Sequence, residues 1–128
     1  MLSADLHWYF GGDTAYSADF KDTQKHFAPR HTELLGGGFD LALLPIGAYA
    51  PRWFMKEQHA NPEEAVQIHL DLGAKRSVGM HWGTFPMTDE SLDQPLKDLA
   101  SARAAHSVGD TAFVVMKIGQ TLQWPARK

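Results

Sequence analysis

The sequence contains no cysteine, so disulfide bonds and thiolate metal sites are excluded. Any metal site must therefore use histidine and carboxylate ligands. No apolar run approaches the ~20 residues that span a bilayer, and the first residues lack the basic flank and long apolar stretch of a signal peptide. There is no basic excess, since 12 Lys and Arg face 15 Asp and Glu. These absences argue against a transmembrane segment and against nucleic-acid binding, and leave the cytoplasm as the expected location.

The chain itself is 128 residues long, with 44% hydrophobic and 21% charged residues. That composition is ordinary for a globular protein, and the length fits one domain with a real core. No internal repeat or low-complexity linker divides it. We therefore expect a single folded unit over residues 1–128.

Apolar and aromatic runs predict strands over residues 6–10, 39–44 and 75–80, and a closing hairpin from residues 113–116 and 121–124. A short helix is expected from Asp19 to Phe27, ended by Pro29, with a glycine turn at 36–38. Residues 45–58 are predicted to be irregular. Asn61 as N-cap and Gly73 as C-cap bound a further helix, and a last helix covers residues 93–106. Strands that alternate with helices indicate an α/β layered fold.

Asp13 and His81 occupy equivalent positions, each directly after a predicted strand. If those strands are parallel, both side chains lie at the carboxyl edge of the sheet, where open α/β sheets bind ligands. A carboxylate and an imidazole brought together there suit zinc. The alternatives are that Asp13 is a turn or cap residue and that His81 is a strand-end histidine bonded to backbone.

His59 is a third candidate, placed in an aromatic segment just before the helix that Asn61 begins. Its alternative role is that of a helix-entry residue. Trp53 lies in the same segment and belongs either to the core or to a pocket wall. His69 is expected inside a helix, as a packing or surface residue.

Three stretches resemble a known family: GGDTAYS, FDLALLPIGAYAPRWFMKEQHANPEEAVQIHLDLGAK and MHWGTFPMTDE. They are similar to the C-terminal half of the N-acyl-phosphatidylethanolamine phospholipase D-like proteins, which are zinc-dependent hydrolases of the metallo-β-lactamase superfamily. The likeness runs in the same order from about residue 6 to 119. It implies part of an αββα sandwich with a two-zinc site at one edge of the sheets.

The resemblance also implies roles for individual residues. Asp13 matches the aspartate that bridges the two metals, and His81 matches a histidine that ligates one of them. Gln58 and His59 match a pair near the active site that touches substrate or supports the ligands, and Trp53 would help form the substrate wall. The substrate class implied is a phosphodiester, such as a phospholipid.

The sequence departs from the family because no HxH motif occurs in it, whereas the family carries HxHxDH in an N-terminal half. We therefore expect this chain to be an incomplete hydrolase, inactive alone, with partial or absent zinc. The alternative is a non-catalytic α/β module whose exposed apolar sheet face pairs with a second copy or with a separate N-terminal half. A weaker alternative is a mononuclear site formed by Asp13, His59 and His81.

Overall fold

A computed structural model describes residues 1–2, 6–33 and 38–124. Its elements in chain order are β1 (Trp8–Phe10), α1 (Asp19–Glu33), β2 (Leu41–Pro45), α2 (Arg52–Met55), α3 (Pro62–Leu72), β3 (Arg76–Met80), α4 (Gln94–Ala105) and β4 (Phe113–Val115). The four strands form one parallel sheet in the order β1-β2-β3-β4. The predicted α/β class is confirmed. The part of the glycine turn at 36–37 lies outside the described residues.

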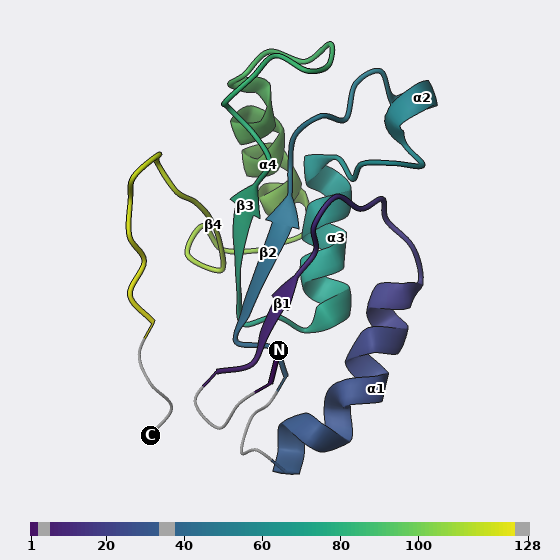
Figure 1. The fold of residues 1–128 in the computed structure, drawn as a ribbon, viewed down its shortest axis with the longest axis vertical. Helices are drawn as coiled ribbons and strands as arrows, with labels where there is room; N and C mark the ends of the chain where they lie inside the picture. The colour runs from purple at the N-terminus through teal and green to yellow at the C-terminus, as the bar shows by residue number, and fades with distance from the viewer. Residues whose placement is uncertain (3–5, 34–37, 125–128) are drawn as a thin grey trace.

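The three long helices lie on one face of this sheet, with α3 between α1 and α4 (Figure 1). Strand β2 shows the two-sided character of the sheet: Ala42 and Leu44 are fully buried against the helices, whereas Leu41 and Leu43 on the opposite face are half-buried. The register places Trp8 beside Leu41 and Phe10 beside Leu43. Among the described residues no helix covers this second face, which we call the open face.

Helix α3 forms where its capping signals predicted. The side chain of Asn61 accepts a hydrogen bond from the Glu64 amide at 2.8 Å, and the Glu64 carboxylate accepts one from the Asn61 amide at 3.2 Å. Gly73 ends the helix in the left-handed conformation, with φ of 61°. These local interactions satisfy backbone groups that the helix ends would otherwise leave unpaired. No helix in the described part of the chain is long and apolar enough to span a membrane.

Three sequence expectations were wrong. Helix α1 does not end before Pro29 but continues to Glu33. Proline removes one amide donor, but it leaves the helix free to continue where tertiary packing holds the next turn. That packing comes from Phe27 and His31, whose rings contact the ring of Phe39.

The closing hairpin does not form either. Phe113–Val115 pairs parallel with β3, and residues 121–124 are not a strand. The chain reaches β4 through the crossover helix α4, which delivers it to the sheet in the parallel direction. Beyond β4 the chain turns at Lys117–Gln120, and the ring of Trp124 instead lies under the guanidinium of Arg76. The segment 45–58 is also not wholly irregular, because α2 begins after Pro51.

Candidate metal centre

Asp13 lies at the carboxyl edge of the sheet because β1 ends in a glycine turn. The Gly11 amide still donates to the Leu43 carbonyl at 2.9 Å, and Gly12 then turns with φ of 62°. Glycine adopts that conformation without the steric cost that a side chain brings. The carbonyl of Thr14 accepts a hydrogen bond from Ala60 at 2.8 Å. This bond ties the loop of Asp13 to the segment that carries His59.

His81 follows β3 at the same edge, and its backbone has φ of 59°, which is uncommon for a residue with a side chain. Its neighbour across the sheet is the loop after β2. The Ile46 amide donates to the Met80 carbonyl at 3.0 Å, and Gly47 packs against the His81 backbone so closely that a Cβ atom there would overlap the His81 carbonyl oxygen. The position of His81 therefore depends on the loop that begins at Ile46.

His59 is held through its main chain. Its amide donates to the Met55 carbonyl at 2.9 Å, and its carbonyl accepts from Nη1 of Arg52 at 2.8 Å. Arg52 in turn forms an ion pair with Glu64 at 2.8 Å, in the first turn of α3. His59 is thus anchored between α2 and α3, and its ring is directed toward the carboxyl edge of the sheet.

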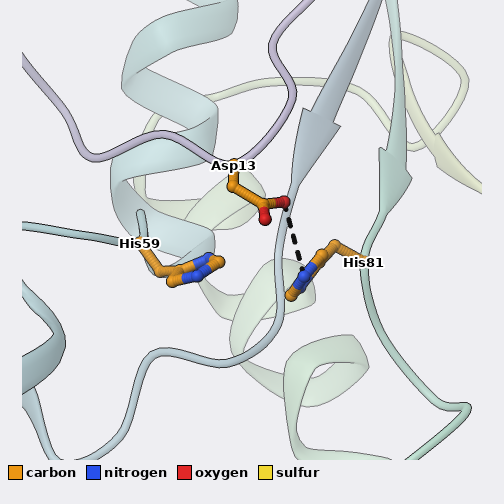
Figure 2. A group of neighbouring side chains, drawn as sticks. All are labelled: Asp13, His59 and His81. Carbon is orange, nitrogen blue, oxygen red and sulfur yellow. Dashed lines mark ion pairs between the residues drawn. The ribbon is translucent and has the colours of Figure 1, made fainter.

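The three side chains converge (Figure 2). Nε2 of His81 lies 3.4 Å from Oδ1 of Asp13, and the ring centroids of His59 and His81 are 4.9 Å apart. Each residue offers one ligand atom, and these atoms all lie within 4.8 Å of one another. Zinc ligands lie about 2 Å from the metal, so the ligand atoms of one tetrahedral ion lie about 3.3 Å apart. The pair formed by His81 and Asp13 already has this spacing, and the ligand atom of His59 would have to move closer to bind the same ion.

The electrostatics of His59 also fit a metal ligand. Burial lowers the pKa of its imidazole, and the neighbouring His81 lowers it further. The ring is therefore neutral at pH 7 and keeps a lone pair. Nδ1 of His59 is buried and has no hydrogen-bond partner in the described part of the chain. A buried nitrogen without a partner is costly unless a ligand or ion satisfies it.

The other two residues that the resemblance placed near the site are exposed. Trp53 on α2 is 86% exposed and Gln58 is also exposed. His69 is a packing residue, as one of its predicted roles states: it is buried in α3, and its Nδ1 lies 2.8 Å from the Ser77 hydroxyl.

A cavity of about 270 Å³ adjoins His81 on the side away from Asp13's strand. Its walls come from residues 47–48 after β2 and from 81–92 after β3, with Pro95 at the start of α4. Sequence reasoning did not identify this cavity, nor the roles of Gly47 and Glu90 around it. The only sequence signal was the stretch MTDE, which follows the HWGTF motif after Pro86.

Residues 6–82 match the beta-lactamase superfamily domain. Because this match covers more than half of the chain, the protein belongs to that superfamily, whose members include metal-dependent hydrolases. The family expected from the motifs is confirmed.

The similarity extends to particular relatives. The chain is 42% identical over 125 residues to N-acyl-phosphatidylethanolamine-hydrolyzing phospholipase D 1 of Caenorhabditis elegans, an alignment that covers 94% of this chain and 32% of the relative. It is 40% identical over 91 residues to the mitochondrial enzyme of that name from Saccharomyces cerevisiae, covering 71% of this chain and 18% of the relative. An uncharacterized Mycobacterium tuberculosis protein is 41% identical over 97 residues, 73% of this chain and 23% of its own length. The chain thus spans about a third or less of these relatives.

Proposed function

We propose that this chain is the C-terminal part of a zinc-dependent hydrolase that cleaves phosphodiesters in the manner of a phospholipase D. The convergence of Asp13, His59 and His81 within 4.8 Å carries the proposal. The worm and yeast relatives are named for the hydrolysis of N-acyl-phosphatidylethanolamine, which supports the choice of substrate class.

Each residue has a distinct part in this proposal. Asp13 supplies a carboxylate oxygen and a negative charge, and His81 supplies Nε2, as metal ligands. His59 stands beside them as a neutral imidazole that either completes the ligand set or meets the substrate. A zinc ion held there supplies Lewis acidity and lowers the pKa of a coordinated water. The adjoining cavity is lined mainly by apolar side chains, which would shield part of a bound phosphodiester from water and strengthen electrostatic interactions with it.

The ligand set also limits what the chain does alone. Catalytic zinc keeps about three protein ligands and an open position, so two ions need more donors than the three that converge here. We therefore propose that residues 1–128 hold at most one zinc ion weakly and do not by themselves reach the activity of a complete family member.

A chimera tests this function. The 125-residue matching segment of the worm relative is replaced by this chain, and zinc-dependent release of N-acylethanolamine from N-acyl-phosphatidylethanolamine is measured. We expect activity in the chimera and background rates for the chain alone. Asp13→Ala and His81→Ala should each lower the rate by at least about 100-fold, since even residues that only orient metal ligands cost 10- to 100-fold.

His26→Ala is the matched control, because His26 is an exposed histidine on α1. A folded chimera that binds zinc but leaves this lipid and bis(p-nitrophenyl) phosphate uncleaved would refute the phosphodiesterase assignment. Full activity of the isolated chain would refute the proposed incompleteness.

The open face favours a second candidate, a non-catalytic module that pairs through its sheet. Phe10 is 58% exposed there, and its neighbours Trp8, Leu41 and Leu43 are only half-buried. A contiguous apolar face of this kind is typical of an interaction surface. A stable dimer of defined size would favour this module, whereas aggregation would favour an incomplete hydrolase.

A further inference from the structure

Glu90 makes an unusual set of contacts for a glutamate in a loop. Its Oε1 accepts hydrogen bonds from the amide of Ala48 at 2.6 Å and from that of Tyr49 at 3.3 Å, and its Oε2 accepts from the amide of Ala50 at 3.0 Å. The hydroxyl of Thr88 donates to Oε1 at 2.8 Å. One carboxylate thus satisfies three successive backbone amides, an arrangement that backbone loops otherwise use to bind anions.

The environment keeps this carboxylate charged. Burial by itself raises the pKa of Glu90, but the hydrogen bonds from Thr88 and from the backbone outweigh it, so the pKa lies below its usual value. Hydrogen bonds to a charged acceptor are also stronger than those between neutral groups. The contact is therefore among the firmest between the two loops that it joins.

Those two loops leave the sheet from neighbouring strands. Residues 46–51 follow β2, and residues 81–93 follow β3 and bring Glu90 back over the first loop. Asp89 adds a backbone hydrogen bond to the Ala50 carbonyl at 3.3 Å. Glu90 thereby fixes the loop after β2, although it lies 40 or more residues further along the chain than the amides it binds.

The first loop contacts His81 directly and is linked to His59 through Arg52, the first residue of α2. At its start, Gly47 packs against the main chain of His81, directly before the amides that Glu90 holds. At its end, Nη1 of Arg52 donates to the Tyr49 carbonyl at 3.4 Å and to the His59 carbonyl at 2.8 Å. A shift of residues 48–50 would therefore move the supports of His81 and His59 together.

We propose that Glu90 is a positioning residue that holds the imidazoles of His59 and His81 next to each other by fixing the loop between β2 and α2. In the described part of the chain no hydrogen bond or ion pair joins Glu90 to either ring, although its negative charge partly offsets the lowering of the His59 pKa. In this proposal Glu90 is not a ligand. Its effect on the arrangement of the rings is independent of any metal, and only the consequence for zinc affinity rests on the proposed function.

Glu90→Gln is the primary test, because glutamine has nearly the same shape as glutamate. Its NH₂ group is a donor, so it cannot accept a hydrogen bond from the backbone amide that it faces. The control is Glu33→Gln, at the exposed end of α1. The nuclear Overhauser effect between the ring protons of His59 and His81 is measured in the 128-residue chain without metal. It should be visible in the parent protein, whose ring centroids are 4.9 Å apart.

We expect this ring-to-ring signal to persist in Glu33→Gln and to disappear in Glu90→Gln, while the amide spectrum of α3 stays unchanged. A purely structural role would lower stability without altering the ring contact in molecules that remain folded. Zinc affinity should fall by about 10- to 100-fold in Glu90→Gln, as for other residues that orient ligands. An unchanged ring-to-ring signal in Glu90→Gln would overturn the proposal.

The experiment also distinguishes failure of the proposed function from failure of the proposed role of Glu90. If the parent protein shows the ring contact but binds no zinc, the proposed function fails, and the ring signal still decides the role of Glu90. If Glu90→Gln does not fold, Thr88→Val replaces it, because it removes one hydrogen bond and keeps the charge. Faster hydrogen exchange at Ala48 and Ala50 with a weaker ring signal supports the proposal, and no change in either contradicts it.

Discussion

Gly47→Ala is expected to destabilise the protein by about 1–3 kcal/mol, the usual cost of overpacking. It is also expected to weaken zinc binding. The added Cβ would overlap the His81 carbonyl oxygen and lie 3.2 Å from Cα of Trp82. Both neighbours are main-chain atoms, so neither can rotate away as the end of a flexible side chain can. The loop after β2 or the backbone of His81 must move, and either movement displaces a proposed ligand.

Urea unfolding and a zinc titration measure the two effects. Gly109→Ala is the matched control, because a Cβ at Gly109 meets nothing within 4 Å and its backbone is not left-handed. That substitution should leave the free energy of unfolding unchanged or raise it by about 0.4–1 kcal/mol, because alanine lowers the conformational entropy of the unfolded chain. Equal stability and equal zinc affinity in Gly47→Ala and the parent would show that the close approach to His81 has no role.

Leu44→Ala is expected to cost about 2–5 kcal/mol, the range for truncating a fully buried leucine. Leu44 is 0% exposed in the central strand β2 and belongs to the core between the sheet and the helices. The adjacent Leu43 points to the open face and is half-buried. Leu43→Ala should therefore cost less than about 1.5 kcal/mol, since part of its surface already contacts water.

Chemical unfolding of the two variants side by side tests the two-faced sheet. The substitutions remove the same atoms from neighbouring positions of one strand, so burial is the main difference between them. A larger cost for Leu44→Ala supports the observed register. Equal large costs would mean that the open face is covered in solution, as the alternative of a pairing module requires.

The sequence predicted those elements whose signals are local. Helix α3 carries its own caps at Asn61 and Gly73, and both interactions form within the helix and its flanking residues. The apolar run of β2 and the position of His81 after β3 were also correctly expected, because parallel strands bring their carboxyl ends to one edge.

The errors arose where distant contacts decide the structure. Helix α1 continues past Pro29 because of rings that meet Phe39, and residues 121–124 pair with no strand because β4 joins β3 in parallel. The proximity of His59 to Asp13 follows from the Ala60–Thr14 hydrogen bond, which no local pattern indicates. Glu90 was missed for the same reason, since its partners are amides of the main chain.

Zinc bound per chain, measured by equilibrium dialysis and elemental analysis after a sizing column, tests the central claim most directly. We expect one weak site that equilibrium dialysis detects and that the sizing column depletes to well below one zinc per chain. Asp13→Ala and His81→Ala should abolish this site, and His26→Ala should not. Zinc binding that is unchanged in Asp13→Ala and His81→Ala would contradict the proposed centre, and two tightly held ions in the parent chain would contradict its incompleteness.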